Sequence, residues 1–269
     1  MTDSMFRLLK RGQVCYLESP RLRENPFLTH AFLTRWNGVS TGKFSSLNLG
    51  LREGDEEERV ARNGRLIADA FGLSVSQFFP IDQVHGDRIV VVEDLRDKDL
   101  PVRCDAVLTA RRGVALAVKT ADCVPLLLAD REKQVVGVVH AGWRGTALGI
   151  AGKAVKALKE RYSSKPGDIL AAIGPAVGVC CYQVDGKVFD AFKRSVSVRE
   201  RALRACQDVE GRWMLDLESA NRIQLMEAGI PRENIFSAAL CTSCRRDLFF
   251  SHRAEKGGTG RHLNFIVLN

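Results

Sequence analysis

Five short apolar runs follow one another through the middle third of the chain, and they constrain the fold more than any other feature. The runs span residues 87–94, 104–110, 114–120, 124–130 and 134–142. Several are apolar without interruption, which is typical of strands that are buried on both faces. A fold in which strands and helices simply alternate would not have so many consecutive strands. The runs therefore predict mixed sheets with helices packed outside.

The segments around these runs supply the helices and the remaining strands. A strand is expected over His30–Arg35, and a helix is expected to begin near Asp55, its N-cap, and to end at Gly72. A second helix is expected from about Thr146 to Arg161, directly after the last apolar run. Further segments continue the alternation of strand and helix, at ILAAIGP (strand), around Phe189 (helix), RWMLDL (strand), Glu218–Ala228 (helix), IFSAAL and LNFIVL (strands).

These elements predict an α/β fold in which mixed β-sheets pack as a sandwich with helices on the outside, in α/β/β/α layers. No internal repeat and no long Pro, Gly or Ser-rich linker interrupts the sequence, so one domain is expected over residues 1–269. The predicted helix faces are apolar at Val60, Leu66, Ile67 and Phe71 in the first, and at Ile150, Ala154, Val155 and Leu158 in the second.

Charge and cysteine content bound the function. The net charge is +8, but the basic residues are dispersed, and the densest stretch, 194–204, lacks interleaved aromatics and is interpreted as an exposed helix face. Nucleic acid is therefore not the favoured partner, whereas a small phosphate-bearing substrate suits the positive field. Neither a signal peptide nor a membrane-spanning stretch is evident, so a cytoplasmic location and reduced thiols are expected for the eight cysteines.

Three residues are candidate metal ligands. His85 lies in QVHGD just before a predicted strand, Cys123 follows TAD between two apolar runs, and His140 ends a buried strand in VVHAGWRGT. Strand ends are where α/β folds place reactive groups, and two imidazoles with one thiolate leave the fourth position of a zinc ion open. The 38 positions from His85 to Cys123 and the 17 from Cys123 to His140 match no local metal motif. Satisfied histidines and a structural cysteine therefore remain the alternative at this point.

Several longer motifs resemble one known family. They are QVHG, LAVKTADCVPLLLAD, VVHAGWRGT, AAIGPAVGVCCYQV, CTSCRRDLFFSHRAEKGGTGR and HAFLTRWNGVSTGKFSSLNLG. Together they are similar to the laccase-domain family, once labelled multicopper polyphenol oxidoreductase and now described as purine nucleoside phosphorylases, and the match covers nearly the whole chain. Three stretches depart from the family pattern outside the metal motifs, because NGVS replaces GGVS, REGDE replaces a VGDD-like stretch and SHRA replaces SYRR.

The resemblance implies a zinc ion bound by His85, Cys123 and His140. It also implies phosphorolysis of adenosine, inosine and S-methyl-5'-thioadenosine, with an accompanying adenosine deaminase activity. Purine nucleosides and inorganic phosphate are therefore the expected partners, and copper is a possible occupant of the same ligands because it outcompetes zinc for them.

Other residues near these motifs are candidates for substrate contacts. Arg144, with the start of the helix after HAGWRGT, is the candidate for binding phosphate, although it could equally pair with a surface acid. Arg35 and Asn48 are candidate donors to ribose or base, and Asn48 could instead be a turn residue. Asp122 could orient a ligand or act as an acid or base, but it could also cap a strand end by bonding backbone amides. Cys181 is a candidate for the pocket lining.

Cys241 and Cys244 form a CxxC pair, which could be half of a zinc ribbon or a redox pair. No second CxxC follows, and the adjacent Cys180 and Cys181 have poor geometry for joining the pair. Structural or incidental thiols are therefore the favoured interpretation.

Three other functions remain open from sequence. A copper-dependent polyphenol oxidase would use the same His, Cys and His ligands, but five histidines are too few for a multicopper enzyme. A metal-independent cysteine hydrolase or amidase would use Cys123 as nucleophile and His140 or His85 as base. A basic nucleic-acid-binding module would need no catalytic cysteine at all.

Overall fold

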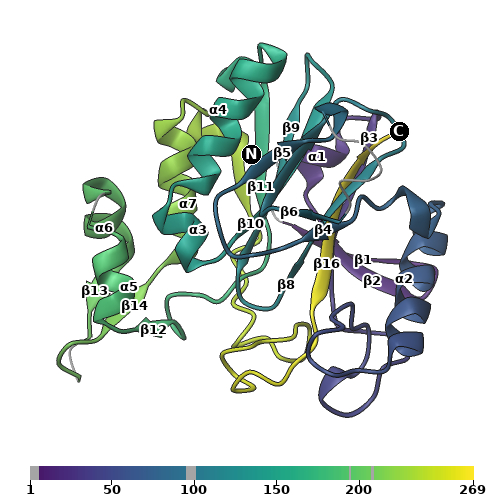
Figure 1. Ribbon diagram of the computed structural model, residues 1–269, viewed down its shortest axis with the longest axis horizontal. Coiled ribbons are helices and arrows are strands. Elements are labelled where there is room, and N and C mark those ends of the chain that lie inside the picture. Colours follow the sequence, from purple (N-terminus) through teal and green to yellow (C-terminus); the bar gives the residue numbers. More distant parts are fainter. Residues whose placement is uncertain (1–5, 95–100, 194, 207–208) are drawn as a thin grey trace.

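Two β-sheets packed face to face form the centre of the structure (Figure 1). The computed structural model describes residues 6–94, 101–193, 195–206 and 209–269. The first sheet is antiparallel, with the strand order β1-β2-β3-β16-β8. Its strands are β1 (Arg7–Arg11), β2 (Val14–Glu18), β3 (Leu28–Leu33), β16 (His262–Leu268) and β8 (Ala115–Thr120).

The second sheet is mixed and has the order β15-β11-β9-β10-β7-β5. Parallel pairing joins β15 to β11 and β5 to β7, and the other neighbours are antiparallel. The strands are β15 (Ile235–Ser237), β11 (Ile169–Ile173), β9 (Val124–Asp130), β10 (Val135–Ala141), β7 (Ala106–Thr109) and β5 (Ile89–Val91). Smaller sheets comprise β12 (Gln183–Val184), β14 (Trp213–Leu215) and β13 (Leu203–Ala205), and β4 (Ile81–Asp82) with β6 (Val102–Arg103).

Side-chain alternation along the strands divides the core into three apolar layers. On β9, Leu126 and Leu128 face α4 (Ile150–Tyr162) and α7 (Leu217–Glu227), whereas Leu127 faces the first sheet. On β16, Phe265 packs outward against α2 (Glu57–Phe71). Helices therefore cover the outer face of each sheet, and the predicted α/β/β/α sandwich is confirmed (Figure 1). The shorter helices are α1 (Pro20–Arg23), α3 (Trp143–Ala147), α5 (Gly186–Ala191) and α6 (Val196–Ala202).

Several predicted bounds need correction. The helix expected from Thr146 to Arg161 is two helices, α3 and α4, because Gly149 adopts a positive φ of 83° between them. Its predicted apolar face is nevertheless buried in α4. The first helix ends before Gly72 as predicted. Its N-cap is Glu56 and not Asp55. The Asp55 carboxylate instead accepts hydrogen bonds from the Glu56 amide and from the side chain of Asn48. The β1–β2 hairpin was not predicted.

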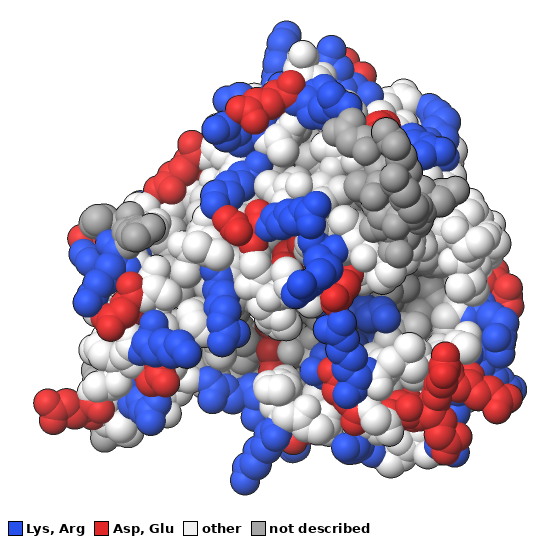
Figure 2. Space-filling view, in the orientation of Figure 1, with Lys and Arg blue, Asp and Glu red and all other residues white. Residues whose placement is uncertain are grey.

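The surface carries its charges in a mixed pattern. On the face shown in Figure 2, Lys and Arg side chains are interspersed with Asp and Glu and form no continuous basic stripe. A helix was predicted over 194–204, and α6 lies within this stretch. The first residue of the stretch, Arg194, lies outside the described residues. Among the helices that the structure describes, none is both long and apolar enough to cross a bilayer.

Gly174, directly after β11, packs against Phe32 of the first sheet without room for a side chain. A Cβ atom at Gly174 would lie 2.2 Å from Cδ1 of Phe32 on one sheet and 2.8 Å from Cγ of Pro125 on the other. Gly174→Ala should therefore lower the free energy of unfolding by about 1–3 kcal/mol, measured by urea denaturation. Gly167→Ala is the control, because no heavy atom lies within 4 Å of its added Cβ. Equal stabilities for the two variants would contradict this packing.

Candidate metal centre

Three nitrogen and sulfur donors converge at the ends of the central strands of the second sheet. His140 lies near the end of β10, and Cys123 directly precedes β9, with which β10 pairs so that Ala141 is opposite Val124. His85 reaches the same point from the loop between β4 and β5. The ligand atoms of the three side chains all lie within 4.8 Å of one another, and the rings of His85 and His140 are perpendicular with centroids 4.7 Å apart.

The buried carboxylate of Asp105 holds this arrangement together. His140 Nδ1 donates to Asp105 Oδ1 over 2.8 Å. The backbone amides of His85 and Gly86 donate to the same carboxylate over 2.9 Å and 2.7 Å, and the amide of Val84 donates over 3.3 Å. One side chain therefore fixes both the orientation of the His140 ring and the loop that presents His85, whose backbone has a positive φ of 60°.

Glycines provide the space in which the donors meet. A Cβ atom at Gly142 would lie 3.1 Å from Cys123 Sγ and 3.3 Å from Cδ2 of His85. At Gly145, an added Cβ would lie 2.6 Å from the backbone oxygen of Gly86 and would displace the His85 loop. Gly142 and Gly145 therefore leave room for Cys123, His85 and the loop that carries His85, which a side chain at either position would crowd.

The electrostatics favour a charged thiolate at Cys123. Burial alone would raise the pKa of its thiol, but the His140 side chain and then the His85 side chain lower that pKa to about 6. Burial would likewise lower the pKa of His140, but the Cys123 thiolate and the Asp105 carboxylate raise it to about 9. The thiolate is the form in which cysteine binds a metal ion or attacks as a nucleophile.

The donor set fits a tetrahedral metal ion. Because Nδ1 of His140 donates to Asp105, its Nε2 is the nitrogen that remains for coordination. Two imidazoles and one thiolate occupy three positions and leave the fourth for water or substrate, which is the pattern of a catalytic zinc site.

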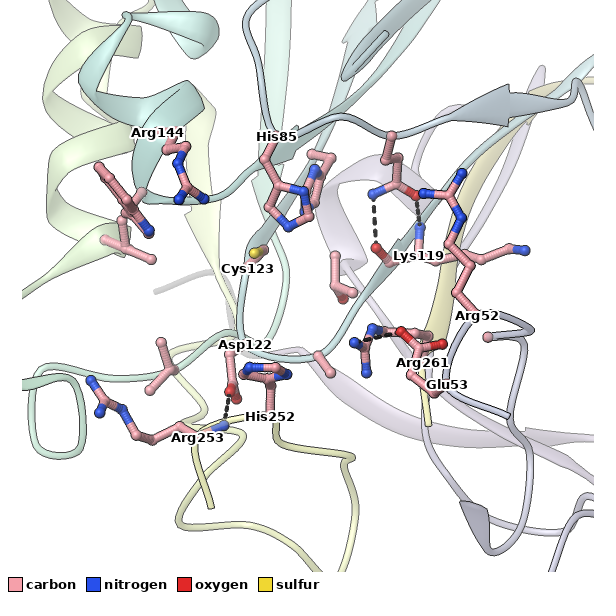
Figure 3. A pocket seen from close by; sticks show the side chains of 18 of the residues that line it. Arg52, Glu53, His85, Lys119, Asp122, Cys123, Arg144, His252, Arg253 and Arg261 are labelled. Carbon is pink, nitrogen blue, oxygen red and sulfur yellow. Dashed lines mark hydrogen bonds and ion pairs between the residues drawn. The ribbon is translucent and has the colours of Figure 1, made fainter. Parts of the chain in front are cut away.

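The three donors lie in a cleft of about 900 Å³, a size typical of small-molecule sites (Figure 3). Cationic side chains are prominent in its lining, namely Arg52, Lys119, Arg144, Arg253, Lys256 and Arg261. Arg261 pairs with Glu53 and Arg52 pairs with Asp82, both over 2.6 Å. Lys119, Arg144 and Lys256 form no ion pair with any described residue, so the cleft retains positive charge that suits an anion.

Asp122 lines the cleft but its carboxylate is fully engaged. Its Oδ1 accepts hydrogen bonds from the hydroxyls of Thr242 and Ser251 over 2.6 Å and 2.7 Å, and its Oδ2 accepts one from the Arg253 amide over 2.5 Å. These bonds fasten the segment before β16 to the end of the second sheet. All three partners come from the segment between β15 and β16, and only one of them is a backbone amide of the kind expected for a strand cap.

Of the other candidate residues, Arg144 lines the cleft, whereas Arg35 and Asn48 are not among the described lining residues. Arg144 lines the cleft and lies over the ring of Trp143, but α3, on which it lies, has only five residues. Arg35 is not among the described lining residues, since its guanidinium lies over Phe250 and pairs with Glu255 over 3.1 Å.

Asn48 is also outside the lining. It is buried, and its side chain bonds the backbone of Gly50 and Arg261 and the carboxylate of Asp55. Cys181 lies beside Tyr182, which lines the cleft, while its own sulfur is directed to Cys244.

Sequence reasoning missed the functional importance of Asp105. An acidic residue at the start of an apolar run, CDAVLTA, is the signal that could have identified it, because a fully buried carboxylate needs several partners. Tyr182, His252 and Arg253 also line the cleft and were not singled out. They lie within motifs that were quoted for the family, and His252 is a residue at which SHRA departs from SYRR, but neither Tyr182 nor Arg253 is marked by a local pattern.

The fold and the site together define a class of protein. It is a two-sheet sandwich that carries a candidate metal centre of two histidines and one cysteine, at its strand ends, in a cationic cleft. The chain belongs to the family described as "Multi-copper polyphenol oxidoreductase laccase", whose model matches residues 29–269. The family suggested by the sequence motifs is thereby confirmed.

Two relatives and one solved structure illustrate the similarity. The chain is 41% identical to the protein named purine nucleoside phosphorylase YlmD of Geobacillus stearothermophilus, over 87% of each chain. It is 38% identical to the protein of the same name from Bacillus subtilis, over 91% of this chain and 90% of the relative. The crystal structure of the Bacillus licheniformis hypothetical protein YfiH superposes with a TM-score of 0.89 at 38% identity, over 98% of this chain and 99% of that one.

The role of Asp105 can be tested through metal affinity. Asp105→Asn keeps the size of the side chain but removes the negative charge and replaces one acceptor oxygen with a donor. Because such partners orient and polarise a ligating imidazole, zinc affinity should fall by about 10- to 100-fold. Competition with a chromophoric chelator measures this change.

Asp130→Asn is the matched control, since Asp130 is also a fully buried carboxylate that accepts backbone amides, those of Glu132 and Lys133. It should leave zinc affinity at the wild-type value. Wild-type affinity in Asp105→Asn would contradict the proposed orientation of His140.

Proposed function

We propose that this protein is a zinc-dependent purine nucleoside phosphorylase. It would cleave adenosine, inosine and S-methyl-5'-thioadenosine with phosphate to the free base and the sugar 1-phosphate, with a side activity as an adenosine deaminase. The observation that carries the proposal is that His85, Cys123 and His140 share one cleft with cationic side chains that form no ion pair with a described residue. Relatives that bear the name purine nucleoside phosphorylase at 38–41% identity support the same reaction.

The described residues suit the two substrates of phosphorolysis. In this reaction a phosphate oxygen forms a bond to C1′ of the ribose while the bond from C1′ to the purine breaks and the purine leaves with the electron pair. Arg144 and the other cations of the cleft can bind phosphate and offset its charge, and a guanidinium can do so through two parallel hydrogen bonds. A zinc ion held by the three donors would supply Lewis-acid polarisation of a bound oxygen.

Aromatic groups in the cleft suit the purine. Trp143, Tyr182 and His252 line it and offer flat faces for stacking. Burial raises the pKa of Tyr182, so its phenol stays protonated and can donate a hydrogen bond to a ring nitrogen or a ribose hydroxyl. These contacts would orient the nucleoside relative to phosphate.

A metal-independent cysteine hydrolase is the second candidate. It is favoured by the low pKa of Cys123 beside a protonated His140, because a thiolate–imidazolium pair is also the resting form of a cysteine nucleophile. The two proposals differ in one respect that can be measured, since only the first needs a metal ion.

A multicopper oxidase has less support. Of the five histidines, His30 accepts the Ser19 amide and His262 accepts the Phe250 amide, and burial lowers the pKa of each imidazole to about 3. Of the histidines, which all lie in the described part of the chain, only His85 and His140 belong to a group of side chains that could hold a metal ion. A single copper ion in place of zinc remains compatible with the same ligands.

A product assay tests the proposal. The zinc-loaded protein is incubated with adenosine, with and without phosphate, and the products are separated by chromatography. Adenine release that requires phosphate is expected. Cys123→Ser should lower the rate by more than about 100-fold, because it removes one ligand of a Lewis acid whose effect is several kcal/mol.

Cys206→Ser is the matched control, because Cys206 is a half-buried cysteine that does not belong to the group of His85, Cys123 and His140. Inosine as the sole product would make deamination the main activity. Turnover that survives complete zinc removal by a chelator would favour the cysteine hydrolase, and absence of any product from a zinc-loaded protein would contradict the nucleoside proposal.

A further inference from the structure

Four cysteines from two distant segments form a second cluster. Cys180 and Cys181 lie in the segment between β11 and β12, and Cys241 and Cys244 lie between β15 and β16. Their sulfur atoms all lie within 4.8 Å of one another. The expectation that Cys180 and Cys181 have poor geometry for joining the CxxC pair is therefore corrected, because tertiary packing brings both into range.

The sulfur atoms are close enough together for one metal ion to bind all four as thiolates. Cys244 Sγ lies 3.4 Å from Cys181 Sγ and 3.6 Å from Cys180 Sγ. In a tetrahedral zinc site with Zn–S bonds of about 2.3 Å, neighbouring sulfurs are about 3.8 Å apart. The CxxC turn is also the usual spacing for one half of such a site.

The backbone around the cluster is arranged for a thiolate. The Gly178 amide donates to Cys241 Sγ over 3.2 Å. A Cβ atom at Gly178 would lie 3.1 Å from Cβ of Cys241 and 3.2 Å from Sγ of Cys180, so this close approach needs glycine.

We propose that Cys180, Cys181, Cys241 and Cys244 bind a structural Zn²⁺ ion that fastens together two segments lining the cleft. Four thiolates complete the tetrahedral coordination and leave no position for a substrate, which separates this site from the one at His85, Cys123 and His140. Zinc fits because it favours four sulfur ligands and undergoes no redox change.

The position of the cluster explains what such an ion would stabilise. The segment from 238 to 261 joins β15 to β16 without a helix or strand of its own, and a segment this long in a compact protein needs other constraints. It contributes His252 and Arg253 to the cleft, while the segment that carries Cys180 and Cys181 continues into Tyr182. Arg253 lies over the Tyr182 ring at 5.1 Å, so the cluster lies beside a direct contact between the two segments.

Metal analysis of the Cys123→Ser variant tests this proposal without relying on nucleoside chemistry. That variant lacks a ligand of the first site, so zinc bound to it reports on the four cysteines. When the full chain is expressed with zinc and purified without chelators, the variant should retain one zinc ion per chain. Adding Cys180→Ser and Cys244→Ser should reduce this to below about one-fifth of an ion, because a site with two thiolates binds zinc far more weakly.

Two further variants separate metal loss from misfolding. Cys206→Ser in the Cys123→Ser background should keep the zinc ion, whereas Gly178→Ala in that background should lower its affinity with all four thiols intact. Replacement of the ion by Co²⁺ should give the intense charge-transfer absorption of a tetrahedral thiolate site.

A Cys123→Ser protein that carries no zinc, carries iron instead, or contains a disulfide among these four cysteines would overturn the proposal. Failure of the phosphorolysis assay would leave the zinc count unchanged, so the two proposals can fail separately.

Discussion

The hydrogen bond from His140 to the buried Asp105 carboxylate is the interaction on which the candidate metal centre depends. The same carboxylate accepts hydrogen bonds from the backbone amides of His85 and Gly86. It therefore connects strand β10, which carries His140, to the loop between β4 and β5. A buried carboxylate is costly unless it is neutralised and fully hydrogen-bonded, and these partners meet both needs. The orientation of the imidazole and the position of the loop are therefore set by one group.

The fold supplies a rigid frame around this interaction. Antiparallel pairing of β9 with β10 brings Cys123 and His140 to the same end of the sheet although 17 positions separate them. Asp122, next to Cys123, then fastens the segment before β16 through Thr242 and Ser251. One wall of the cleft is thus built from a segment without helix or strand, held by hydrogen bonds to Asp122 and, in our proposal, by a zinc ion on four cysteines.

The layers and most strands could be predicted from sequence because apolar runs report burial directly, and the run 124–130 coincides with β9. Local signals failed where the outcome depends on tertiary contacts. The β1–β2 hairpin was missed because β1, RLLKR, has exposed and basic positions. Arg35 and Asn48 carry donor groups that suit a ligand, yet these groups donate to the protein's own backbone, at Ser45 O and Gly50 O. The convergence of Cys180 and Cys181 with Cys241 and Cys244 joins segments about sixty positions apart, and no local spacing encodes it.

In the proposed enzyme, His85, Cys123 and His140 hold a zinc ion in the cleft that they line. Anomalous X-ray diffraction from crystals of the zinc-loaded protein, recorded just above and just below the zinc absorption edge, tests this most directly. A zinc peak is expected within bonding distance of the Cys123 sulfur and of one ring nitrogen from each histidine, at about 2.0–2.3 Å. Absence of a peak there, with the three side chains ordered, would show that these residues do not form a zinc site.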